Sequence, residues 1–268
     1  VTPRTPAYEP SISSLYQSVP FDQDTAFLSI GERTNANGSK AFREAMVEGR
    51  INDCVEIAKD QARDGAHLLD LCIDYVGRDG VADMKALAGV LSTTSTLPIM
   101  LDSTEPEVIE AGLELLGGRC VVNSVNYEDG NEPGSRIQRI MPVIKEHGAA
   151  VVALTIDEEG QARDAQWKVR VATRLIEDLT GNWGMNVSDI MVGSVGKAER
   201  RHRPPPESSP QRMRADVAER SIGRSAEVVW GQSSPGGGRP RCLQELLAGR
   251  HQVVCPGTDP LGVADQHG

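Results

Sequence analysis

The chain has 268 residues, of which 39% are apolar, and a formal net charge of −10 at pH 7. This length and apolar fraction predict a globular body of one large or two small domains. The acidic balance argues against a nucleic acid partner, because phosphate binding requires a basic face. No apolar stretch is long enough to span a bilayer and no signal-peptide core is visible, so we expect a cytoplasmic protein with no membrane partner.

Short apolar runs alternate with longer amphipathic segments along the first 192 residues. The expected strands are 26–30, 67–73, 98–101, 120–125, 149–156 and 189–192. The expected helices are 40–64 (as two helices), 82–91, 106–116, 136–147 and 165–179. This alternation predicts an α/β fold with a parallel sheet. Both a (β/α)8 TIM-type barrel and an open doubly wound sheet fit, and the absence of a GxGxxG run after the first strand favours the barrel.

The composition changes after the sixth expected strand. The segment 193–268 contains ten Arg but one Lys, eight of the sixteen Pro, and neither Phe nor Tyr. We therefore expect a disordered, low-complexity tail, and we predict that a shifted reading frame accounts for it. The predicted division is an N-terminal extension (1–25), a barrel portion of about five and a half βα units (26–192) and this tail (193–268).

Polar side chains follow five successive expected strands. In a barrel the carboxyl ends of the strands share one rim, where the chemistry of the fold is located. A single Asp or Ser after a strand is usually a helix cap, but five such ends in a row predict a site. Carboxylates and amides favour a neutral or cationic heterocycle with several N–H donors over an anion. These ends are Gly31–Asn35, Asp70 with Asp74, Asp102–Thr104, Asn123–Asn126 and Asp157–Glu159.

Four stretches of the chain, in this order and spacing, closely resemble the folate-binding domain of the cobalamin-dependent methionine synthases. They are GERTNANGSK (31–40), DGAHLLDLCIDYVGRDG (64–80), PIMLDSTEPEVIEAGLELLGGRCVVNSVNYEDG (98–130) and GAAVVALTIDEEGQAR (148–163). The resemblance covers roughly residues 14–192. It implies a barrel that binds 5-methyltetrahydrofolate as substrate and presents its methyl group to cob(I)alamin on a separate cobalamin-binding module.

The resemblance also implies roles for particular residues. It makes Asp102 the aspartate that holds the pterin, with Asn123 as its partner. A carboxylate accepts two parallel hydrogen bonds from the 2-amino group and ring N–H of a pterin, and an amide donates and accepts at once. The implied folate contacts on the loop after the first strand are Gly38, Ser39 and Lys40, with Glu32 lining the same mouth. Further candidates at the same level are Asp70, Asp74 and Asp157.

The chain departs from the family pattern at the end of the sixth strand. The family has a second pterin-holding aspartate there, whereas this chain reads Val192-Gly193-Ser194, and the asparagine expected after a seventh strand has no counterpart. No catalytic residue is therefore assigned. Without a D-x-H-x-x-G motif or a cysteine-rich cluster, we expect neither cobalamin nor zinc to bind this chain directly. The alternatives are a pterin enzyme of the dihydropteroate synthase type and an inactive truncated fragment.

Overall fold

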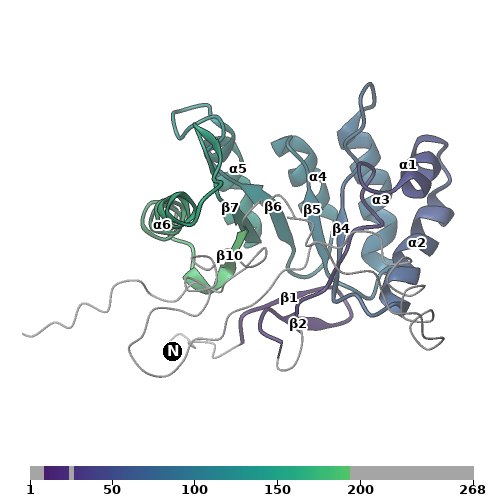
Figure 1. Cartoon of the computed structure of the whole chain (residues 1–268). Helices are drawn as coiled ribbons and strands as arrows, with labels where there is room; N and C mark the ends of the chain where they lie inside the picture. The colour runs from purple at the N-terminus through teal and green to yellow at the C-terminus, as the bar shows by residue number, and fades with distance from the viewer. Residues whose placement is uncertain (1–8, 24–26, 194–268) are drawn as a thin grey trace, which may run out of the picture.

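A computed structural model describes residues 9–23 and 27–193 of the chain (Figure 1). Six parallel strands form one curved sheet in the order β10-β7-β6-β5-β4-β3. The arrangement confirms the predicted α/β class and the incomplete barrel. Gly193, the first residue of the predicted tail 193–268, belongs to β10, and the rest of that tail, for which a shifted reading frame is predicted, lies outside the described residues. The strands are β3 (Ile30–Gly31), β4 (Leu68–Leu71), β5 (Ile99–Asp102), β6 (Val121–Val125), β7 (Ala150–Leu154) and β10 (Ile190–Gly193).

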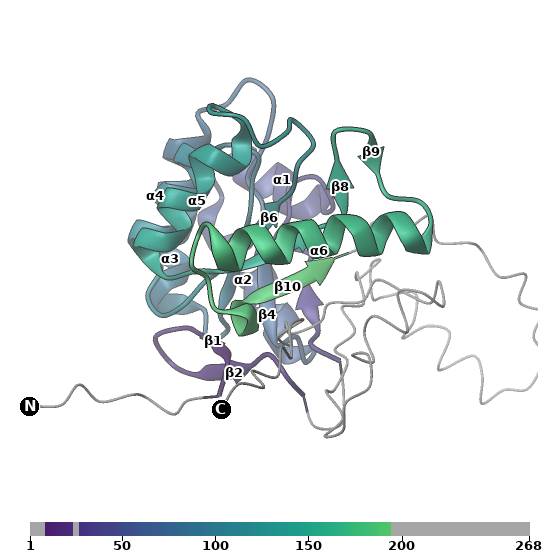
Figure 2. The ribbon, with the colours of Figure 1, turned by 90° about the vertical axis from the view of Figure 1, so that its left-hand side faces the viewer.

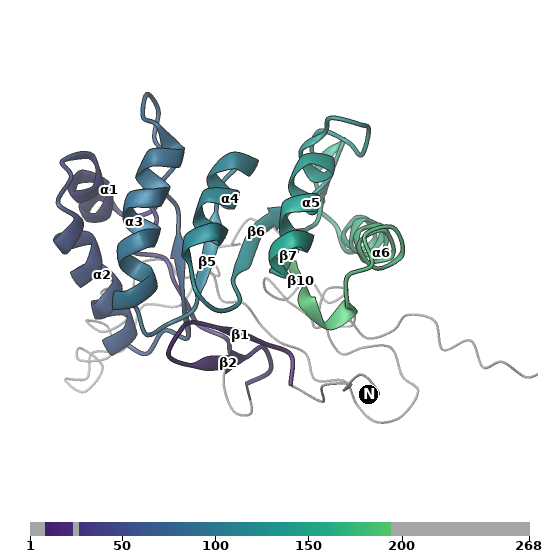
Figure 3. The same ribbon diagram turned by 180° about the vertical axis from the view of Figure 1, so that it is seen from behind.

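Helices cover the outer, convex face of the sheet, as the view from behind shows (Figure 3). The predicted helical segment 40–64 divides at Gly49, whose φ of 71° suits glycine, so the expected two helices form. No helix in the described part of the chain is long and apolar enough to cross a membrane. The helices are α1 (Lys40–Val47), α2 (Ile51–Arg63), α3 (Gly80–Thr94), α4 (Pro106–Leu115), α5 (Arg136–His147) and α6 (Ala165–Gly181).

The two faces of the sheet pack into two separate apolar clusters. Because side chains alternate along a strand, Leu69 and Leu71 of β4 point outward to the helices, while Leu68 points inward. Helix α4 lies very close to β5, since a Cβ added at Gly112 would be 2.8 Å from a methyl group of Leu101. The outward cluster therefore holds the helices on the sheet, and the inward residues fill the lower part of the concave face.

An antiparallel hairpin closes the N-terminal end of the sheet. Strands β1 (Ser11–Ser13) and β2 (Ser18–Pro20) fall within the predicted extension 1–25 and lie across the lower ends of the parallel strands (Figures 1 and 2). Ile12 and Phe21 are buried among the inward residues of the sheet. Ser13 pairs with Arg119, just before β6, through two backbone hydrogen bonds of 3.0 Å. The hairpin is thus part of the folded core.

Three predicted strands are clearly shorter in the structure, among them the one expected over 67–73, which is β4 (Leu68–Leu71). Of the strand expected over 26–30, the structure forms β3 from Ile30, with Leu28 in an isolated bridge. The carbonyl of Ser29 accepts from the backbone N–H of His67 (2.8 Å), while its N–H donates to Nδ1 of the same residue (2.9 Å). The strand expected over 149–156 ends at Leu154. The chain then forms a small hairpin of β8 (Ile156–Asp157) and β9 (Gly160–Gln161) before α6.

Candidate functional site

The carboxyl ends of β4, β5 and β6 bring three of the sequence-predicted polar residues to the concave face. Asp102 of β5 lies in register with Asn123 of β6, so the two side chains are neighbours on the same face. Asp70 of β4 lies in register with Met100, one step deeper than Asp102. Asp70 is only 4% exposed, whereas Asp102 and Asn123 are half-buried. The three residues form a cluster in which the carboxyl group of Asp70 lies deep in the concave face, and the pair of Asp102 and Asn123 lies nearer the solvent.

Asn35, on the loop between β3 and α1, connects the two carboxylates. Its Nδ2 donates to Oδ2 of Asp70 (2.8 Å) and to Oδ2 of Asp102 (3.0 Å). Its Oδ1 accepts from the backbone N–H groups of Asn37 (2.9 Å) and Gly38 (3.1 Å). Both ends of the amide are therefore engaged, which fixes its orientation. The polar loop after the first strand organises the site through this residue, which the sequence reasoning did not single out.

The carboxylates of the cluster resist ionisation. Burial raises the pKa of Asp70, and the charge of Asp102 raises it further, while the hydrogen bond from Asn35 acts in the opposite direction. Burial also raises the pKa of Asp102, as do the charges of Asp74 and Glu32. Oδ1 of Asp70 is buried and makes no hydrogen bond within the described residues. Two close carboxylates of this kind favour a shared proton, and Asp70, the deeper one, is the group best placed to hold it.

The loop residues Gly38, Ser39 and Lys40 lie at the rim, on the far side of Asn35 from the carboxylates. The hydroxyl of Ser39 caps α1 by accepting from the backbone N–H of Phe42 (3.3 Å). The ammonium group of Lys40 is exposed and 3.6 Å from Glu44. No hydrogen bond in the described part of the chain joins these three residues to Asp102 or Asn123. Glu32 is half-buried, and its charge acts on both carboxylates of the cluster.

The other two candidate aspartates have different surroundings. Asp74 accepts from the hydroxyl of Ser103 at 2.8 and 3.0 Å and from the backbone N–H of Thr104 (3.2 Å), so it holds the loop that follows Asp102. Asp157 is buried and accepts from Nε1 of Trp167 on α6 (2.8 Å). The structure therefore places Asp74 beside the cluster and engages Asp157 in attaching the β8–β9 hairpin to α6.

Asn123 differs from its neighbours in that its amide makes no hydrogen bond with any other described residue. A half-buried amide with both its donors and its acceptor available is suited to a ligand that presents a donor and an acceptor side by side. Next to it, the carboxylate of Asp102 accepts hydrogen bonds only. Together they match the edge of a heterocycle that carries two adjacent N–H donors and a ring acceptor.

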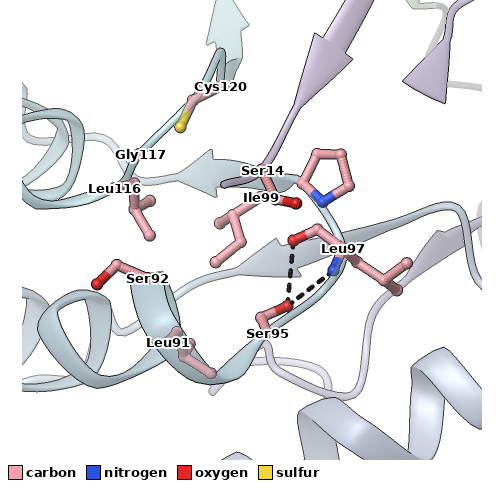
Figure 4. Close-up of a pocket in the computed structure, with 10 residues that line it drawn as sticks. Ser14, Leu91, Ser92, Ser95, Leu97, Ile99, Leu116, Gly117 and Cys120 are labelled. Atoms are coloured by element: carbon pink, nitrogen blue, oxygen red, sulfur yellow. Dashed lines mark hydrogen bonds between the residues drawn. The ribbon is translucent and has the colours of Figure 1, made fainter. Parts of the chain in front are cut away.

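A small cavity lies at the other end of the strands, beneath the hairpin (Figure 4). It is lined by Ser14, Leu97 and Cys120 among others. Its volume of about 10 Å³ is about what one water molecule needs. The hydroxyl of Ser95 within it already bonds to the backbone N–H (3.2 Å) and carbonyl (3.1 Å) of Leu97. A cavity of this volume cannot hold a ligand larger than a water molecule, so the carboxylate cluster is the candidate site. No group of three or more His, Cys, Asp or Glu side chains in the described residues is arranged to hold a metal ion.

The curved parallel sheet, with the carboxylate–amide cluster at its carboxyl end as the candidate site, defines an α/β part-barrel. Residues 31–196 match the family model described as pterin binding enzyme, and the chain belongs to this family.

Its relatives include two mycobacterial proteins named methionine synthase, which confirms the resemblance seen in the sequence. The chain is 68% identical to that of Mycobacterium tuberculosis over 192 residues, which are 72% of this chain and 16% of the relative. It is 68% identical to that of Mycobacterium leprae over 185 residues, 69% of this chain and 15% of the relative. The chain thus spans about a sixth of the length of these relatives.

Solved structures of dihydropteroate synthases share the fold. The enzyme of Xanthomonas albilineans in complex with indole-2-carboxylic acid and 6-chloroguanine superposes with a TM-score of 0.51 at 15% identity, over 69% of this chain and 64% of that one. The Yersinia pestis enzyme in a sulfonamide drug complex gives a TM-score of 0.50 at 11% identity, over 68% and 66%. At these identities the likeness supports the barrel-type fold alone.

Proposed function

We propose that this chain binds 5-methyltetrahydrofolate through its pterin ring and serves the methyl transfer of a methionine synthase. The observation that carries the proposal is the pair of Asp102 and Asn123, in register on adjacent strands at the carboxyl end of the sheet. Family membership and the two mycobacterial relatives support the same ligand class.

In this proposal the pterin lies edge-on to the cluster. The carboxylate of Asp102 accepts hydrogen bonds from the 2-amino group and the adjacent ring N–H, in a charge-assisted fork. Asn35 orients that carboxylate from behind by donating to its Oδ2. The amide of Asn123 bonds to the neighbouring donor and acceptor atoms of the ring. The residues around the loop after β3, Glu32, Gly38, Ser39 and Lys40, border the part of the folate that extends beyond the pterin.

The methyl acceptor belongs to another part of the enzyme. The family resemblance implies cob(I)alamin carried on a cobalamin-binding module, which when present supplies the nucleophile for the methyl group. The residues of this chain bind and orient the folate at the rim and exclude water from the pterin edge. Lowering the solvent exposure of the ring strengthens each of these hydrogen bonds.

Calorimetric titration of the 268-residue chain with 5-methyltetrahydrofolate tests the proposal. Asp102→Ala removes the fork and leaves ring donors unpaired, so the binding free energy should fall by about 2–3 kcal/mol. Asn123→Ala should cost less, about 1–2 kcal/mol, because the lost bonds are between neutral groups. Glu110→Ala is the control, since Glu110 is an exposed acid on helix α4, outside the strand ends that form the candidate site. Affinity that is unchanged in Asp102→Ala would show that the pterin site lies elsewhere.

A further inference from the structure

Arg136, the first residue of α5, contacts the residue that follows Asp102, although the sequence analysis did not single it out. Its Nη2 donates to the backbone carbonyl of Ser103 (2.6 Å), the residue that follows Asp102. Its backbone N–H donates to Oδ2 of Asp129 (2.7 Å), which fixes the start of the helix. Nε of Arg136 is buried and without a hydrogen-bond partner in the described residues.

Ser103 is held from two sides as a result. Its hydroxyl donates to Asp74 on the loop after β4, and its carbonyl accepts from Arg136 on α5. Two neighbouring βα units thus hold the backbone at the position next to Asp102. A side chain whose backbone is held in this way keeps a narrow range of orientations, which a directional hydrogen-bond fork requires.

The guanidinium of Arg136 also has an electrostatic effect on Asp102, in addition to holding the backbone. Asp102 is surrounded by acidic or neutral groups from three segments: Glu32 and Asn35 on the loop after β3, Asp70 on β4, and Asp74 on the loop after β4. Among the described residues, Arg136 is the cation whose charge acts on Asp102, and its effect lowers the pKa of that carboxyl. Burial lowers the pKa of Arg136 itself, an indication that its charge is kept in a partly dry environment.

We propose that Arg136 is a positioning residue that keeps Asp102 ionised and aimed at the pterin edge. The inference rests on the proposed folate binding but concerns a different residue, on the helix that follows β6. Desolvation of an arginine with an unpaired Nε is a cost that packing alone would not favour. That cost is offset when the charge stabilises the carboxylate that the ligand requires.

The test is the pH dependence of folate binding by the full chain. Removing the cation in Arg136→Gln should move the acid midpoint, at which affinity is lost, upward by about 0.5–1 pH unit. Because Asp102 has a pKa of about 6, the affinity at pH 6 should then fall by about 2- to 5-fold. At pH 8.5 it should stay within about 2-fold of the wild type, since Asp102 is ionised there in both proteins. Arg136→Lys keeps the charge and should recover most of the shift.

Arg139→Gln is the control, because Arg139 is exposed on the same helix less than one turn away. A purely structural role predicts an equal loss of affinity at every pH in Arg136→Gln, and that result would overturn the proposal. So would a lysine variant whose midpoint moves as far as that of the glutamine variant. If Arg136→Gln does not fold, Arg136→Met, which buries no unpaired polar group, takes its place with the same expected shift.

A ligand-free measurement separates this inference from the proposed function. Carboxyl carbon NMR of the apo chain, with Asp102→Asn to assign the signal, reports the titration of Asp102 directly. Arg136→Gln should raise that midpoint whether or not the wild type binds folate, and an unchanged midpoint would refute the positioning role. A wild type that titrates as expected but does not bind 5-methyltetrahydrofolate would instead refute the proposed function alone.

Discussion

The two ends of the same sheet are built on opposite principles. At the N-terminal end, the guanidinium of Arg119 bonds to the carbonyls of Gly148 (2.9 Å) and Ser11 (3.2 Å) and pairs with Asp189 (2.8 Å). Apolar residues of the hairpin fill the space between. At the C-terminal end, Asp70 is buried with an unbonded oxygen and its pKa is raised. The guanidinium of Arg119 is thus fully engaged at the closed end, whereas the carboxyl group of Asp70 keeps an unbonded oxygen at the end proposed to bind the ligand.

The largest expected effect on stability lies at the N-terminal end. Ile12 on β1 is fully buried, so Ile12→Ala removes apolar contacts and leaves a cavity. We expect the free energy of unfolding to fall by about 2–4 kcal/mol, measured by urea denaturation. Gln17→Ala, on the exposed turn of the same hairpin, is the control and should change it by less than about 0.5 kcal/mol. If Ile12→Ala behaves like the control, the hairpin does not contribute to the core.

At the other end of the sheet, where Asn35 connects the two carboxylates, we expect a smaller effect, and it concerns ligand affinity instead of stability. Asn35→Ala removes the donor shared by Asp70 and Asp102, so the pKa of each carboxyl should rise and the fork should lose its orientation. Affinity for 5-methyltetrahydrofolate at pH 7 should fall by about 1–3 kcal/mol, measured by calorimetry. Asn37→Ala, on the exposed part of the loop, is the control. Equal affinities of the two variants would remove Asn35 from the site.

The smallest expected effect is a gain in stability. The pKa of Asp70 is higher in the folded protein than in the unfolded chain, where it is about 3.9. Asp70 therefore contributes fully to the free energy of unfolding below pH 3.9, and this contribution is lost as the pH rises through the pKa of the folded protein. Asp70→Asn keeps an acceptor for Asn35 and cannot ionise. At pH 8 it should therefore raise the free energy of unfolding by about 1–2 kcal/mol, and at pH 4 the two proteins should be alike.

Urea denaturation at the two pH values measures this gain. The exposed Asp22→Asn serves as the control, and it should show no difference between the two pH values. A loss of stability in Asp70→Asn at pH 8 would mean that the ionised carboxylate of Asp70 supports the fold. The contrast between the two ends of the sheet would then not hold for this residue.

Much of the fold and part of the site follow from local patterns in the sequence. Apolar runs of strand length, separated by amphipathic segments with capping residues, determined the order of the parallel strands and helices. The family resemblance paired Asp102 with Asn123, and the parallel register places the two as neighbours on one face of the sheet. These features are local, or depend on one regular rule that relates adjacent strands.

The tertiary structure alone decided which polar groups meet. Asn35 bridges carboxylates that are 35 and 67 positions away, and Arg136 reaches a carbonyl 33 positions earlier. Asp157 stands at a strand end like Asp102, yet it bonds to Trp167 because a short hairpin turns the chain toward α6. The hydrogen-bond partner of a side chain depends on distances of a few ångströms between segments far apart in the chain. Composition and periodicity carry no information on such distances, so only the packed barrel wall determines them.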